Sequence, residues 1–162
     1  KKLLFMGAEF AQRSEWNHNQ SLDWHLLDSH FHQGIQSFVT DLNQLLKEHP
    51  SLYQQDIDDM CFEWIQANNH EQSVLVWMRK AQDEEQLIVT LNMTPNLHEH
   101  YRFGVPDSVH LEEILNSDDL RYGGSGQGNS SLIYTDQVPA DGFNSSVGIL
   151  LAPLAVQFFK VI

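Results

Sequence analysis

Carboxylate, amide and indole side chains occur close together near the start of the sequence, in a combination that suits a sugar ligand. Glu9 comes three residues after the apolar run of residues 2–6. Two indoles follow in the pairs Trp16-Asn17 and Asp23-Trp24. An indole face packs on the C–H surface of a sugar ring, while amides and carboxylates bind its hydroxyls. We therefore predict that these five residues, called the rim below, contact a sugar.

Each rim residue also has a structural interpretation. A carboxylate at Glu9 can accept hydrogen bonds from loop amides, and Trp16 or Trp24 can anchor a long loop to the protein. We do not predict catalysis by Glu9, because glycoside chemistry normally uses two carboxylates and the sequence places no second one at a defined distance. Sugar binding and anchoring both remain open at this stage.

The nine histidines do not form a metal-binding pattern. His98 and His100 would alternate along a strand, and the single Cys61 leaves no Cys/His framework. Zinc needs three or four ligands that converge on one point. We expect no metal site and no cofactor.

A glycine-rich segment, GGSGQGN at residues 123–129, resembles a phosphate-binding loop only in composition. It lacks the Lys-Ser or Lys-Thr pair of such loops, and the apolar residues 132–134 predict a strand after it rather than a helix. Its glycines allow positive φ angles. We expect a compact surface loop that packs against a neighbouring domain.

The charge of the chain argues against two classes of partner. It has 22 Asp and Glu against 9 Lys and Arg, for a formal net charge of −13. Such a chain repels nucleic-acid phosphates and anionic membrane surfaces, whereas a neutral sugar is unaffected. No apolar run reaches the roughly 20 residues that span a bilayer. We expect no nucleic-acid or membrane partner.

The single cysteine cannot form an internal disulfide. This favours a reducing compartment, and we expect the protein in the cytoplasm.

The rim depends on the elements around it. Residues 2–6 form the short apolar run typical of a buried strand. Residues 8–28 have no regular period and predict a long ordered loop, whose aromatic content favours a functional role. Such a loop after a parallel strand lies on the face where active sites occur. One strand–loop–helix unit cannot fold alone, and the chain begins on it without Met, so we expect a fragment of a longer protein.

Residues 29–48 predict an amphipathic helix. Apolar residues recur at helical spacing from Phe31 to Leu46. Asp28 or Ser29 can cap its start, and Pro50 ends it, because the residue before a proline disfavours the helical conformation. We expect part of this apolar stripe to remain exposed or to drive self-association.

From about residue 59 onward the sequence is typical of an all-β domain. Short runs rich in Val, Ile, Leu, Trp and Phe alternate with polar turns. The predicted strands lie at residues 61–66, 73–80, 86–94, 101–105, 132–134, 147–151 and 155–162. We expect two parts, 1–58 and 59–162, and a mainly β fold: an antiparallel β-sandwich preceded by one strand, loop and helix.

Several strings, in the same order along nearly the whole chain, resemble those of 1,4-α-glucan (glycogen) branching enzymes of the α-amylase superfamily. The strongest are YGGSGQGN at residues 122–129 and EWN with SLDW at residues 15–17 and 21–24. The others are FMGAEFAQ at 5–12, HQG at 32–34, DLN at 41–43, EHP at 48–50, FEWI at 62–65, QSVL at 72–75, NMTP at 92–95, YRFGVP at 101–106 and LAPLA at 151–155. Ala11 stands where glycine is commoner in the family, which affects only the expected loop backbone.

The resemblance implies a fold and a function. Residues 1–58 would be the last strand, loop and helix of a (β/α)8 barrel, and residues 59–162 the C-terminal β domain. Family members cut an α-1,4 linkage and transfer the released chain to a 6-hydroxyl, which creates an α-1,6 branch; this makes the full-length protein a glycosyltransferase. Their three catalytic carboxylates belong to earlier barrel strands, so no catalytic residue is assigned here and the chain alone is expected to be inactive.

The same resemblance implies partners and leaves two alternatives. The partners would be α-glucan, as glycogen or maltooligosaccharides, and the N-terminal barrel of the same protein, with the rim bordering the acceptor or donor cleft. One alternative is another hydrolase of the superfamily, such as a debranching or trehalose-releasing enzyme. The other is a non-catalytic glucan-binding or interaction module.

Overall fold

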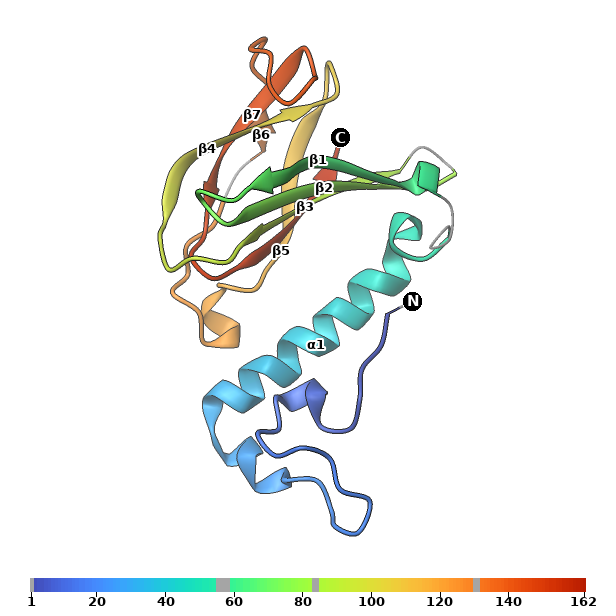
Figure 1. Ribbon diagram of the computed structural model, residues 1–162, viewed down its shortest axis with the longest axis vertical. Helices are drawn as coiled ribbons and strands as arrows, with labels where there is room; N and C mark the ends of the chain where they lie inside the picture. Colours follow the sequence, from blue (N-terminus) through green and yellow to red (C-terminus); the bar gives the residue numbers. More distant parts are fainter. Residues whose placement is uncertain (1, 55–58, 83–84, 130–131) are drawn as a thin grey trace.

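The C-terminal part of the chain forms strands wherever its apolar residues recur in short runs. The computed structural model describes residues 2–54, 59–82, 85–129 and 132–162 (Figure 1). Eight strands lie within these residues, and every pairing between them is antiparallel. They are β1 Phe62–Asn69, β2 Val74–Lys80, β3 Gln86–Asn92, β4 His98–Val105, β5 His110–Asn116, β6 Ile133–Tyr134, β7 Ser145–Leu151 and β8 Val156–Val161.

These strands form two sheets that pack face to face. Six lie in the order β1-β2-β3-β8-β5-β6, and β4 pairs with β7 in the second sheet. Apolar side chains from both sheets fill the space between them and are almost completely buried: Val76, Met78, Ile88, Phe103, Val147 and Ile149. The predicted mainly β fold with an antiparallel sandwich is confirmed.

Strand β5 is the element that the sequence prediction missed. Two acidic residues, Glu112-Glu113, are followed by two apolar residues, Ile114-Leu115. This order breaks the alternation of apolar and polar residues expected for a strand. The structure shows the reason, because the pairing of β5 with β8 shifts register between Glu113 and Leu115. A bulge of this kind adds one residue and changes the face on which the next side chain lies.

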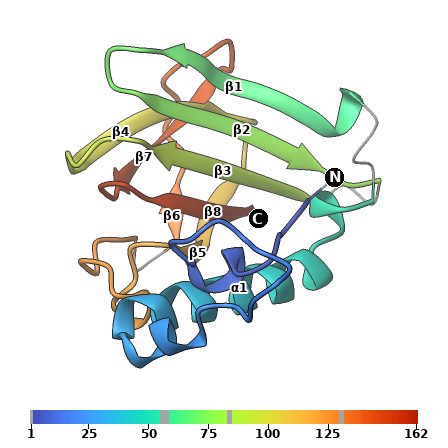
Figure 2. The same ribbon diagram turned by 60° about the horizontal axis from the view of Figure 1, so that its bottom comes forward.

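The predicted helix is confirmed as α1, His30–Glu48, which lies against the outer face of the larger sheet (Figures 1 and 2). Leu45 packs there with Leu87 and Leu115, in a second core separate from the one inside the sandwich. Ser29 occupies the N-cap position without a side-chain capping bond. Pro50 ends the helix, as predicted, and begins the short turn η3, Pro50–Leu52.

Residues 2–6, predicted as a buried strand, form no strand in this structure, so their place in a barrel stays a prediction. These residues adopt no regular structure, and Leu3 is 85% exposed. A strand needs backbone partners, and no strand among the described residues pairs with this segment. The following residues 8–28, predicted as a loop, contain two short 3-10 turns, η1 Ala8–Phe10 and η2 Trp24–Asp28.

Part of the apolar stripe of α1 stays uncovered, as the sequence predicts. Phe31 is 60% exposed and Ile35 is 37% exposed. Farther along the helix, Leu42 and Leu46 line an apolar groove of about 430 Å³ together with Leu3 and other residues. Self-association through this surface stays a prediction.

The predicted boundary between parts 1–58 and 59–162 adjoins residues 55–58, which lie outside the described residues. On either side of it, α1 and the sandwich share the second core. The division of the chain at residue 59 therefore stays a prediction, although the helix and the strands clearly separate along the sequence.

A carboxylate joins the end of α1 to the sandwich. Glu85 lies just before β3 and accepts hydrogen bonds from His49 Nδ1 at 2.7 Å and from the Ser51 N–H at 3.0 Å. Burial acts to raise the pKa of Glu85, but these hydrogen bonds and the charge of His49 outweigh it and lower the pKa below its ordinary value. The ionised form of Glu85 therefore stabilises the fold.

Replacement of this carboxylate should change how stability depends on pH. Because the folded pKa of Glu85 is lowered, its contribution is present above the unfolded pKa and is lost as pH falls through the folded pKa. Glu85→Gln should reduce the free energy of unfolding by about 1–2 kcal/mol at pH 7 and flatten its decline between about pH 5 and pH 3. Urea unfolding followed by circular dichroism measures both. Glu112→Gln, at an exposed position on β5, is the control; parallel pH profiles for Glu85→Gln and the unchanged protein would refute the expectation.

Candidate functional site

The loop that carries the rim is fixed to the first turns of α1. Gly7 and Ala11 flank η1 and have positive φ angles of 88° and 56°. Between them, Phe10 is fully buried. Its carbonyl oxygen accepts a hydrogen bond from Nδ1 of His32, a buried residue of α1, at 2.8 Å. This bond from His32 to the backbone of Phe10 holds the loop against the helix.

The carboxylate of Glu9 has a structural role in this loop. Its Oε2 accepts a hydrogen bond from the Gly7 N–H at 3.0 Å, which is the arrangement expected of a loop-stabilising carboxylate. Glu9 is only partly buried, and a carboxylate has about four acceptor positions. The structural interpretation is therefore observed, while a sugar contact by the remaining acceptor positions stays a prediction.

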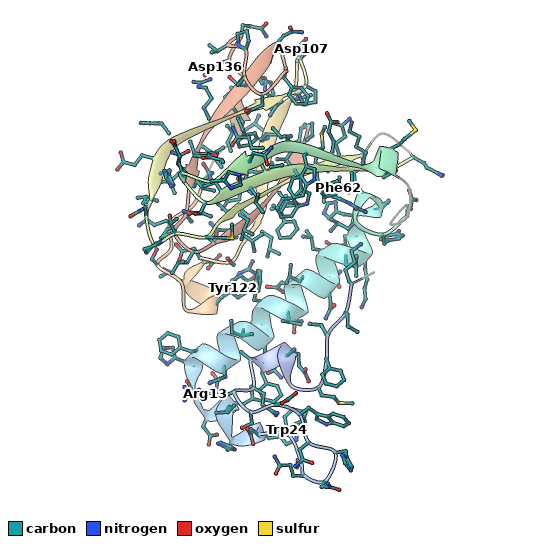
Figure 3. All side chains as sticks on the ribbon, in the orientation of Figure 1. Arg13, Trp24, Phe62, Asp107, Tyr122 and Asp136 are labelled. Atoms are coloured by element: carbon teal, nitrogen blue, oxygen red, sulfur yellow. The ribbon has the colours of Figure 1, made fainter. Side chains whose placement is uncertain are left out.

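Each of the two indoles packs against a ring of the same loop and stays partly exposed. The ring of Trp24 lies 5.1 Å from that of Phe10 between centroids, and Trp24 is 51% exposed (Figure 3). Trp16 meets Phe5 edge to face at 5.5 Å and is 38% exposed. Each indole thus anchors the loop and still presents surface on which a sugar ring can pack.

The two polar rim residues lie at turns of the same loop. Asn17 Oδ1 accepts a hydrogen bond from the Asn19 N–H at 3.0 Å, so its side chain shapes the turn. The Asp23 N–H donates to Oε1 of Gln12 at 2.9 Å. Gln12 also packs against Gly7, where an added β-carbon would lie 2.8 Å from its own.

Gln12 is a residue whose role the sequence interpretation missed. It joins the start of the loop to its end, and so helps to hold Trp24 beside Phe10. Trp16 lies instead beside Phe5. The only sequence signal for Gln12 was its place at the end of the string at residues 5–12.

The glycine-rich segment is a compact loop, as predicted. Gly123 and Gly126 have positive φ angles of 87° and 79°. Asp118 organises the segment, because its carboxylate accepts from the Ser125 N–H at 2.8 Å and the Gln127 N–H at 3.1 Å. These two amides therefore already have an acceptor and do not require a bound phosphate.

The described residues offer neither a metal site nor a membrane-spanning helix. No three His, Cys, Asp or Glu side chains among them are grouped in a way that could hold a metal ion. In the same residues, no helix is long and apolar enough to cross a membrane. His98 and His100 lie two positions apart on β4, as predicted for a strand.

Comparison with known proteins shows the family to which this fold belongs. The family model described as the alpha amylase, C-terminal all-beta domain matches residues 64–162, the part that forms the sandwich. The chain belongs to this alpha-amylase C-terminal domain family. The resemblance to the α-amylase superfamily inferred from the strings is thereby confirmed.

Members of the family that are similar to the chain extend the match to the rim. A 1,4-alpha-glucan branching enzyme, GlgB, of Nitrobacter hamburgensis is 46% identical over 159 residues, which cover 98% of this chain and 22% of that protein. The enzymes of the same name from Shewanella frigidimarina and Cellvibrio japonicus are 45% and 47% identical, each over 160 residues, or 98% and 99% of this chain. The chain spans about a fifth of the length of these curated relatives, 22% in each case.

The anchoring of the rim leads to a prediction about Phe10. Phe10→Ala removes a fully buried ring that contacts Trp24, and should reduce the free energy of unfolding by about 3 kcal/mol. It should also shift tryptophan emission to longer wavelength, because Trp24 loses its packed face. Fluorescence-monitored urea unfolding measures both effects. Phe31→Ala, at a ring that is 60% exposed, should cost less than half as much; equal costs would contradict the packing.

Proposed function

We propose that the chain is part of a 1,4-α-glucan branching enzyme. The observation that carries the proposal is the identity of about 46% over 98% of the chain, which includes the rim loop as well as the sandwich. In the reaction, the bond from C1 to O4 of a linear glucan breaks and a bond from C1 to O6 of an acceptor forms. The proton of the acceptor hydroxyl ends on the released O4. No water is consumed, so the number of reducing ends stays constant.

Within that enzyme, residues 1–58 would complete the catalytic barrel and residues 59–162 would form the supporting β domain. The catalytic carboxylates would lie on barrel strands of the rest of the protein, so this chain would supply binding groups rather than the reacting ones. The partners would be glycogen or maltooligosaccharides and the N-terminal barrel. The cytoplasm is the proposed location, in line with the low cysteine content of the sequence.

The rim would bind the glucan beside the reacting bond. Trp24 offers exposed indole surface, and Glu9 on the same loop has acceptor positions that the Gly7 N–H does not use. Because the loop is held by Phe10 and Gln12, these groups are set in place before substrate arrives. Preorganised contacts of this kind lower the cost of binding, and energy from such remote contacts can support the transfer step.

The products made from linear glucan test the proposal. The full-length protein should form new α-1,6 linkages, detected by NMR or by debranching, without an increase in reducing ends. A rise in reducing ends would identify a hydrolase of the superfamily instead. Titration calorimetry separates the remaining alternative: maltooligosaccharide binding without any transfer by the full-length protein would indicate a non-catalytic module.

Substitution of an indole tests the role of the rim. Trp24→Ala in the full-length protein should raise KM for linear glucan about fivefold, because the stacking surface is lost, while Trp24→Phe should retain part of the effect. Initial rates of branch formation over a range of glucan concentrations give KM and kcat. Tyr134→Ala, at an exposed ring on β6, is the control. An unchanged KM in Trp24→Ala would remove Trp24 from the glucan site.

A further inference from the structure

The glycine-rich loop is held rigidly on the sandwich by carboxylates. Asp118, which is 9% exposed, accepts the two loop amides described above. Glu113 on β5 accepts from the Asn129 N–H at 3.2 Å and from its side-chain amide at 2.7 Å. An added β-carbon at Gly124 would lie 2.2 Å from the carbonyl oxygen of Asp118. The loop therefore moves with the strands rather than independently of them.

One face of α1 rests on Tyr122, the residue just before this loop. An added β-carbon at Gly34 would lie 2.2 Å from the carbonyl oxygen of Tyr122, so the helix is in direct contact with the backbone there. The Tyr122 hydroxyl donates to Oδ2 of Asp41 at 2.5 Å, and its ring lies 5.1 Å from that of Phe38. Positions 34, 38 and 41 fall within about 40° of one direction around a helix, so all three contacts belong to a single face.

The Tyr122 hydroxyl keeps its proton. Burial and the hydrogen bond to Asp41 both raise the pKa of this phenol far above its ordinary value. The bond to Asp41 is thus a constant feature of the interface. Arg121 Nη1, 3.1 Å from the same carboxylate oxygen, supports it from the solvent side.

The rim is attached to the opposite face of the same helix turns. His32 precedes Gly34 by two residues, which is about 200° around the helix. Its Nδ1 binds the carbonyl oxygen of Phe10, whose ring packs on Trp24. Figure 3 shows Tyr122 and Trp24 on opposite sides of α1.

We propose that Tyr122 is a positioning residue for the rim. Together with Gly34, Tyr122 sets the distance of α1 from the sandwich. The position of α1 in turn determines where the loop with Glu9 and Trp24 lies, because His32 on α1 binds Phe10 of that loop. The inference rests on the glucan-binding role of the rim proposed above. Displacement by 1 Å at a substrate-binding group is enough to impair a reaction, so a contact on the far side of α1 affects binding without touching the glucan.

Hydrogen exchange of the rim loop tests the positioning directly, without an activity assay. Tyr122→Phe keeps the ring and removes the bond to Asp41. Amides of residues 7–12 and 23–28 in the full-length protein, measured by mass spectrometry, should exchange about tenfold faster than in the unchanged protein. Tyr134→Phe, on the far edge of the larger sheet, should leave their exchange unchanged.

A second variant acts on the same interface from the helix. Gly34→Ala would normally stabilise a helix, but here the methyl group must displace the backbone of Tyr122. It should lower the thermal midpoint and accelerate exchange at residues 7–12. Gly148→Ala is the matched control, because its added β-carbon would have only Arg102 Nη2 within 4 Å, at 3.9 Å.

The outcomes separate this inference from the proposed function. Faster exchange at the rim together with a KM raised more than kcat is lowered supports positioning, since simple loss of folded protein lowers kcat and leaves KM unchanged. Faster exchange in a protein that forms no branches supports positioning and refutes the branching function. If both Tyr122→Phe and Gly34→Ala leave exchange at residues 7–12 and 23–28 unchanged, the positioning role is overturned.

Discussion

The close approach of α1 to the backbone of Tyr122 is the contact on which the arrangement of this protein depends. It is possible only because residue 34 has no β-carbon. Once the helix lies at that distance, Phe38 and Asp41 reach the Tyr122 ring and hydroxyl, and Leu45 reaches the apolar face of the larger sheet. The loop before α1 has its own anchors on the helix, so its place relative to the sandwich follows from this contact.

The acidic residues of the chain stabilise its loops as well as giving it a negative net charge. Carboxylates of Glu85, Glu113 and Asp118 accept backbone N–H groups at places where neither helix nor sheet supplies a partner. A buried amide without an acceptor is costly, and an ionised acceptor forms a stronger bond than a neutral one. Part of the negative charge that repels nucleic acids thus stabilises the loops that join the helix to the strands.

The structure reconciles the two interpretations of the rim rather than choosing between them. Glu9 binds a loop amide, and Trp24 packs on Phe10, yet both retain exposed surface. A flat indole can be an anchor and a binding platform at once because its two faces are independent. A rigid platform also loses less entropy when it binds a ligand, so anchoring favours the proposed glucan contact.

The sequence by itself determined the helix, most strands and the sandwich, because these depend on short-range periods of apolar residues. It also determined the family, from strings such as YGGSGQGN at residues 122–129. It failed at β5, where a bulge breaks the period, and residues 2–6 form no strand here because an apolar run becomes a strand only where a partner strand lies beside it. Only the tertiary structure decided the role of Gln12 and the contact of Gly34 with Tyr122. Those contacts join residues distant in sequence, and their energy comes from distances that no local pattern records.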